Sequence, residues 1–228
     1  MARGQRAGLA VEKETGRVEA FSDGVFAIAI TLLVLTLHVP PLKPDESMAG
    51  LAGDLTHQWP AYIAFVTSFA TILIMWTHHH AIFALLYRAD VRLLVANGLL
   101  LLIVTVVPFP TALVATHLLT PAAPVAVAVY AATFAVGTLA YNALWWAAVH
   151  DPGLLAPDAP PGGFRAVRPD YVSGFPPYLA AVVLAFWNAY VSLAICFALW
   201  ILWALTSRAQ PAPQRSLASS SEERGDGV

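Results

Sequence analysis

Long runs of apolar residues constrain this chain more than any other feature of its sequence. A helix needs about 20 predominantly apolar residues to cross roughly 30 Å of hydrocarbon. Four runs meet this requirement, at residues 21–37, 59–83, 93–119 and 124–149. Hydrophobic residues make up 58% of the chain and charged residues only 11%, whereas soluble domains contain about a quarter charged residues. We therefore predict an all-α integral membrane protein.

The last apolar run, residues 177–206, is too long for one span and short for two. The sequence "FWNAY" at 186–190 offers a polar, aromatic break of the kind found at membrane interfaces, so we divide the run near Asn188. Cytoplasmic loops are enriched in Lys and Arg. With six spans and both termini in the cytoplasm, Lys43 is the one basic residue outside, whereas five spans would place three C-terminal arginines outside. The sequence thus predicts six transmembrane helices.

This topology divides the chain into three parts. We expect a cytoplasmic N-terminal tail at 1–16, a six-helix transmembrane domain at 17–207 and a disordered cytoplasmic tail at 208–228. The polar N-terminal tail lacks the apolar core of a signal peptide, so we expect the first run to be retained as a span. Cys196 is the single cysteine, which leaves no disulfide framework. No basic run with interleaved aromatic residues points to a nucleic-acid partner.

Polar residues near the inner ends of the first three spans are predicted to lie at one depth. Ser22 and Asp23 open the first span, "WTHHH" at 76–80 closes the second, and Asn97 lies early in the third. Unsatisfied polar atoms at membrane depth cost several kcal/mol. We therefore predict an interhelical hydrogen-bond network that contains Asp23, His79 or His80, and Asn97. Direct contact between Asp23 and a transported ion is the alternative.

The three consecutive histidines, His78, His79 and His80, also raise the question of a metal site. Successive residues point about 100° apart on a helix, so three in a row cannot converge on one ion as an i, i+4 pair can. The HExxH spacing is absent, and no nucleophile and base can be paired, so we predict neither a metal site nor an enzyme. A proton-coupled secondary transporter that uses Asp23 and these histidines is the alternative function.

An apolar stripe follows Asp23 along the first span. Ile28, Leu32 and Leu35 share one helix face, and Thr31 lies at its edge. Asp23 is rotated from Ile28 by about 140° and so lies elsewhere. Spacing alone favours contact of this stripe with lipid or with another helix.

Several motifs in the first half of the chain resemble the potassium-channel family of transmembrane protein 175. The sequence "RVEAFSDG" matches the R-x-x-x-F-S-D-G signature that opens the first helix in this family. "WTHHHAIF", the "AN" at 96–97 and the "PFPT" at 108–111 are similar to the family's second and third helices. These elements span residues 17–111, and on them the chain is identified as a prokaryotic member of the family.

The resemblance implies a potassium-preferring cation channel whose first helix lines the pore. The hydrophobic constriction of the family falls on Ile28, Leu32 and Leu35, and its pore threonine on Thr31. The resemblance also implies a structural polar network between the first three helices, with the members Arg17, Ser22, Asp23, Trp76, His79, His80 and Asn97.

The resemblance further implies a homotetramer, because animal relatives join two six-span repeats and assemble as dimers. The TVGYG filter of other potassium channels is absent, so selectivity is expected from the apolar constriction, which can gate by dewetting. We expect no cofactor, monovalent cations as the permeant species, and a multi-pass location in a bacterial plasma membrane.

Overall fold

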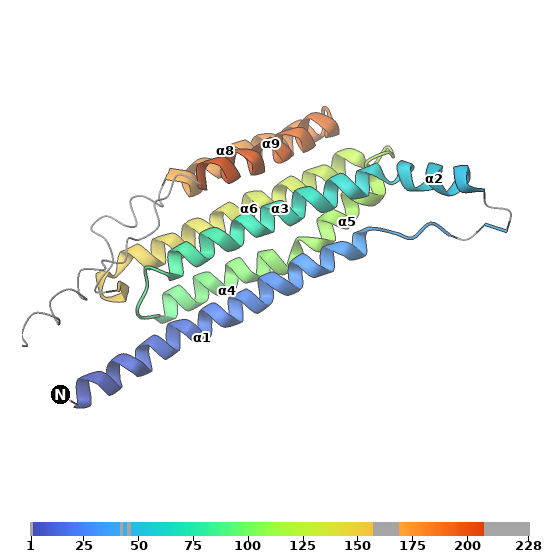
Figure 1. The fold of residues 1–228 in the computed structure, drawn as a ribbon. Coiled ribbons are helices and arrows are strands. Elements are labelled where there is room, and N and C mark those ends of the chain that lie inside the picture. Colours follow the sequence, from blue (N-terminus) through green and yellow to red (C-terminus); the bar gives the residue numbers. More distant parts are fainter. Residues whose placement is uncertain (1, 42, 45–46, 157–168, 208–228) are drawn as a thin grey trace, which may run out of the picture.

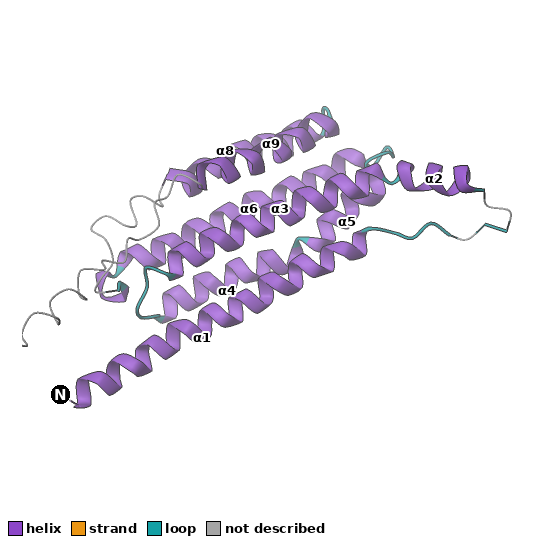
Figure 2. Ribbon diagram, viewed as in Figure 1, coloured by secondary structure: helices purple, strands orange, loops and turns teal. Residues whose placement is uncertain are grey.

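The computed structural model describes residues 2–41, 43–44, 47–156 and 169–207, and the regular elements in these ranges are helices (Figure 1, Figure 2). This confirms the all-α prediction. The predicted C-terminal tail at 208–228 lies outside the described residues. The α-helices are α1 (Ala2–Leu32), α2 (Met48–His57), α3 (Trp59–Phe83), α4 (Val91–Val106), α5 (Pro108–His117), α6 (Ala123–His150), α8 (Pro169–Ala185) and α9 (Ala189–Ser207), with the short 3₁₀ helices η1 (Leu33–Thr36) and η2 (Pro152–Leu154).

Within the described residues, four helical stretches are long and apolar enough to cross a membrane: Thr15–Thr36, Trp59–Phe83, Val91–His117 and Ala123–His150. They coincide with the four apolar runs in the sequence. The first helix begins at Ala2, well before the apolar run, because no proline interrupts the polar segment that precedes it.

The third stretch consists of two helices that meet at a proline. α4 ends at Val106 and α5 begins at Pro108. A proline inside a helix has no N–H to donate and its ring clashes with the preceding turn, whereas it is well suited to the first turn of a new helix. The N–H of Val107 accordingly bonds the carbonyl of Val104, at 3.3 Å, in a tighter turn.

The last apolar run is divided between α8 and α9, with the break at residues 186–188. The side-chain oxygen of Asn188 accepts hydrogen bonds from the N–H groups of Tyr190, at 3.0 Å, and Val191, at 3.2 Å. Asn188 therefore caps the start of α9. The apolar parts of these helices, Gly174–Ala185 and Ala189–Leu205, are shorter than the four stretches before them.

The helices pack around α6, which contacts α4, α5, α8 and α9. Figure 1 shows α1 along one edge of the bundle and the α8–α9 pair along the opposite edge. α1 packs on α3 and α4. α2 extends beyond the end of the bundle and contains no buried residue. One face of α1 is consequently left without a partner among the described residues of the subunit.

Hydrogen bonds to loop residues connect the helices at one end of the bundle. The apolar part of α1 begins at this end. The hydroxyl of Thr15 donates to the carbonyl of Tyr87 in the α3–α4 loop, at 2.9 Å. The N–H of Tyr87 in turn donates to the carbonyl of Leu154, at 2.8 Å, in the segment after α6. These bonds fix the start of the apolar part of α1 relative to α3, α4 and α6.

Candidate functional site

A chain of buried hydrogen bonds joins α1, α3 and α4. His79 Nε2 lies 2.9 Å from Asn97 Oδ1, and Asn97 Nδ2 donates to Ser22 Oγ at 3.0 Å. The Ser22 hydroxyl then donates to the carbonyl of Val18, one turn earlier in α1, at 2.9 Å. Because the Asn97 amide donates to serine, its oxygen is the acceptor and His79 Nε2 carries the proton. All three side chains are buried, so the chain of bonds fixes α1 against two neighbours.

Asp23 makes a separate bond to α3. The indole N–H of Trp76 donates to Asp23 Oδ1 at 2.8 Å, and both residues are half-buried. Depth in the membrane grouped Asp23 with a histidine and Asn97, whereas the bond goes to Trp76, which the family resemblance includes in the network. Asp23 follows Ser22 on α1, and the rotation of about 100° between successive residues turns it towards α3.

A third contact lies one turn from the Asp23–Trp76 bond. His80 Nδ1 lies 2.8 Å from Glu19 Oε1, and the His80 ring stacks on Trp76 with 6.0 Å between ring centroids. Glu19 and Asp23 are four residues apart on α1, and Trp76 and His80 are four apart on α3. The two helices run antiparallel, so the two acids of α1 contact the two aromatic rings of α3 in successive turns. Sequence reasoning missed Glu19, although its spacing from Asp23 was a usable signal.

The three histidines lie in three different environments. His78 is buried on the side of α3 that faces α9 and lies 6.2 Å from Trp203 between ring centroids. His79 contacts Asn97, and its ring stacks on Phe83 at 4.4 Å. His80 is on the α1 side, paired with Glu19. In the described part of the chain, no three His, Cys, Asp or Glu residues gather as metal ligands.

Arg17 stands apart from these bonds. Its side chain is exposed, and it makes no hydrogen bond or salt bridge with the residues that the structure describes. Its membership of the polar network therefore stays a prediction.

The apolar stripe of α1 points away from the subunit. Ile28 is 61% exposed, Leu32 42% and Leu35 69%, and Thr31 is also exposed. The opposite face of the same segment is buried, with Phe26, Ala29, Leu33 and Thr36 packed against the bundle. The stripe is thus a continuous apolar surface that no other described part of the chain covers.

The helix geometry changes within this stripe. α1 ends at Leu32 and continues as η1, whose buried Leu33 and Thr36 face α3 and α5. The Thr31 hydroxyl donates to the carbonyl of Ile28 at 2.8 Å, so its proton is occupied while its oxygen can still accept. The stripe therefore presents one hydroxyl oxygen among three aliphatic side chains.

A second buried polar cluster lies deeper in the bundle and was not predicted. Ser68 Oγ lies 2.8 Å from Thr111 Oγ1 and 3.0 Å from the Tyr130 hydroxyl. The three residues come from α3, α5 and α6 and are fully buried. Sequence spacing gave no sign of this cluster, because its members belong to three separate helices. The cluster fixes α5, which contacts η1, to α3 and α6.

Comparison with known proteins identifies one family. A family described as "Endosomal/lysosomal potassium channel TMEM175" matches residues 17–108. A protein of Chamaesiphon minutus named as a potassium channel is 49% identical over 87% of this chain and 97% of its own length. A protein of Streptomyces collinus, also named as a potassium channel, is 42% identical over 91% of this chain and 99% of its own length.

A solved structure shares the fold. The crystal structure of a lysosomal potassium-selective channel TMEM175 homolog from Chamaesiphon minutus aligns with a TM-score of 0.77 at 48% sequence identity. The alignment covers 86% of this chain and all of that one. The matched family region, residues 17–108, contains the three polar contacts of α1 and the exposed stripe.

Proposed function

This chain belongs to the TMEM175 family, and on that premise we propose that it is a potassium channel. The proposal is supported by the two relatives named as potassium channels, each similar over nearly its whole length. It is also supported by the common fold with a potassium-selective TMEM175 homolog.

The observation that carries the proposed mechanism is the exposed apolar stripe of α1. One helix per subunit cannot enclose a pathway, so several copies must bring their α1 helices together around an axis. We propose a homotetramer in which Ile28, Leu32 and Leu35 form a hydrophobic constriction and Thr31 supplies the hydroxyl oxygen beside it. Ions would pass this constriction by adjusting their hydration, and dewetting would close it.

The polar contacts have a structural role in this proposal. The Ser22–Asn97–His79 chain and the Asp23–Trp76 bond hold α1 on α3 and α4. They thereby determine which face of α1 turns towards the axis. Asp23 is engaged by Trp76 and lies off the stripe, which favours a structural role over direct contact with the ion.

We propose six spans per subunit, with α8 and α9 as the fifth and sixth. Both termini then lie in the cytoplasm, and the protein resides in a bacterial plasma membrane. The distribution of Lys and Arg along the sequence supports this orientation. No cofactor has a role in the proposed mechanism, and the permeant species is a monovalent cation.

Flux into proteoliposomes tests the function. The purified protein is expected to pass potassium rapidly, less sodium, and to do so when a protonophore removes any proton gradient. Potassium movement that requires an opposing proton gradient would overturn the channel and support the proton-coupled transporter, with Asp23 and His78–His80 as its relay.

A further inference from the structure

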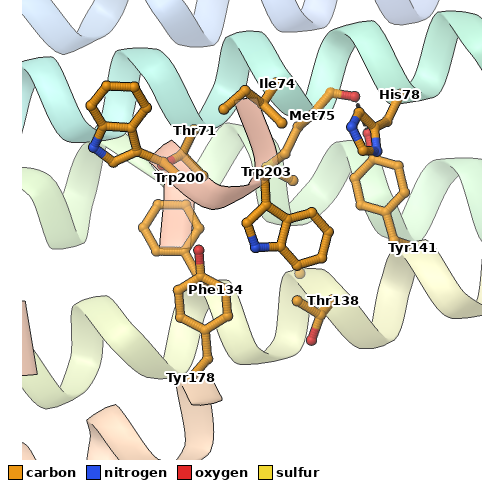
Figure 3. Close-up of a pocket in the computed structure, with 11 residues that line it drawn as sticks. Thr71, Ile74, Met75, His78, Phe134, Thr138, Tyr141, Tyr178, Trp200 and Trp203 are labelled. Carbon is orange, nitrogen blue, oxygen red and sulfur yellow. Dashed lines mark hydrogen bonds between the residues drawn. The ribbon is translucent and has the colours of Figure 1, made fainter. Parts of the chain in front are cut away.

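A half-open cavity with a volume of about 50 Å³ lies between helices of the subunit, on the other side of α3 from α1. Its walls come from α3, α6, α8 and α9 (Figure 3). Five of its eleven lining residues have large aromatic side chains, namely Phe134, Tyr141, Tyr178, Trp200 and Trp203. Neither the polar contacts of α1 nor the exposed stripe involves this cavity, so the proposed conduction pathway leaves it unexplained.

Two side chains of the cavity wall carry polar groups without a partner among the residues that the structure describes. Tyr178 is only 5% exposed, and its hydroxyl makes no hydrogen bond there. The indole N–H of Trp200 is likewise buried and unbonded. Figure 3 shows the Tyr178 hydroxyl directed across the cavity, towards the side where Thr71 and Trp200 lie. A buried hydroxyl without a partner is costly, so a ligand that bonds it gains free energy.

The two threonine hydroxyls that line the cavity already donate hydrogen bonds within their own helices. Thr71 donates to the carbonyl of Thr67 at 2.8 Å, and Thr138 donates to the carbonyl of Ala135 at 2.7 Å. Each oxygen can still accept a bond. The cavity thus offers a free phenol and two acceptor oxygens within a largely apolar wall.

Size and charge restrict the ligand. Roughly 10–15 Å³ is enough for a water molecule, and an apolar cavity of about 150 Å³ holds benzene. A cavity of about 50 Å³ therefore suits a molecule between these two. Among the described residues, its lining includes one titratable imidazole, that of His78, and no acid, lysine or arginine to pair with a charged ligand.

We propose that this cavity is a binding site for a small uncharged alcohol, with the ligand hydroxyl on Tyr178 and its hydrocarbon part against the tryptophans. Such a molecule dissolves in the bilayer and can reach the site from lipid. Its binding would contact α3 at Thr71 and Met75, next to Trp76, which holds Asp23 of α1.

The test uses 2,2,2-trifluoroethanol as the probe and fluorine NMR as the readout, with the full-length protein in detergent micelles. The wild type is expected to give a saturable change in the probe signal. Tyr178→Phe keeps the ring and removes the hydroxyl, so it should weaken binding about two- to tenfold, as expected for one hydrogen bond. Thr138→Phe fills the cavity and should abolish saturable binding.

Tyr62→Phe is the matched control, because Tyr62 lies outside the cavity near the start of α3 and is partly exposed. It should bind like the wild type. A signal that rises without saturation in every sample would show partition into the micelle alone and overturn the site. Equal affinity of the wild type and Tyr178→Phe would overturn the role of the phenol, whatever the fate of Thr138→Phe.

Discussion

Trp76 holds Asp23 through a single hydrogen bond of 2.8 Å from its indole N–H to the carboxylate. This bond joins α1 to α3 at the depth where the apolar part of α1 begins, one turn before the exposed stripe. Asp23, an acid near the start of the apolar part of α1, thus bonds α3 on the side of α1 away from the stripe. The bond therefore helps to fix the rotation of α1 about its own axis.

Trp76→Phe should destabilise the protein by about 1–3 kcal/mol, because a half-buried carboxylate loses its donor. Thermal unfolding in detergent measures the effect. Trp187→Phe is the control, since Trp187 is exposed in the loop between α8 and α9 and should leave the unfolding temperature unchanged. Equal unfolding temperatures for Trp76→Phe and the wild type would show that the bond contributes nothing.

Asn97→Ala should destabilise more than Ser22→Ala, because it removes a donor to Ser22 and an acceptor for His79 together. The combination of both substitutions should cost less than the sum of the two, since the residues share one bond. Unfolding free energies of the two single variants and the double variant measure this coupling. Strictly additive effects would mean that Ser22 and Asn97 act independently.

Glu19→Gln should have a small effect, below about 1 kcal/mol. The His80 side chain is 57% exposed, and exposed contacts between a carboxylate and a polar side chain contribute little because solvent competes for them. Thermal unfolding of Glu19→Gln and Trp76→Phe shows which of the two contacts, Glu19–His80 or Asp23–Trp76, stabilises the protein more. A larger loss of stability in Glu19→Gln than in Trp76→Phe would reverse the expected order.

Ile28→Asn should weaken the discrimination between potassium and sodium, because an amide in the proposed constriction lets water remain around either ion. The reversal potential under opposing potassium and sodium gradients measures it. Val183→Asn places the same amide on the exposed face of α8 and should leave selectivity unchanged. An unaltered reversal potential in Ile28→Asn would remove Ile28 from the constriction.

The sequence predicted the long apolar helices well, because length and composition define them. The 59–83 run coincides with α3, and the helix break at Asn188 followed from one polar residue among aromatics. The helix boundary at Pro108 was missed inside an uninterrupted apolar run. α2 was also missed, because a ten-residue helix without a buried face leaves a weak pattern.

The sequence predicted that the polar residues of the candidate site lie at one depth, but it did not predict which of them contact one another. The inner ends of the first three apolar runs placed Asp23, His79 and Asn97 in one layer. Which side chains contact one another depends on the rotation of each helix about its axis. That rotation pairs Asp23 with Trp76 and His80 with Glu19. The cavity at Tyr178 draws its walls from four helices, and no local pattern records such an arrangement.

Silver block of single-cysteine variants tests whether the stripe of α1 lines the proposed conduction pathway. Cys196 is first replaced by alanine, and cysteine is then placed at Leu35, at buried Leu33, or at exposed Val183 on α8. Silver ions should block potassium current in Leu35→Cys and leave Leu33→Cys and Val183→Cys conducting. Block at Leu33 or Val183 with none at Leu35 would show that another face of the subunit lines the pathway.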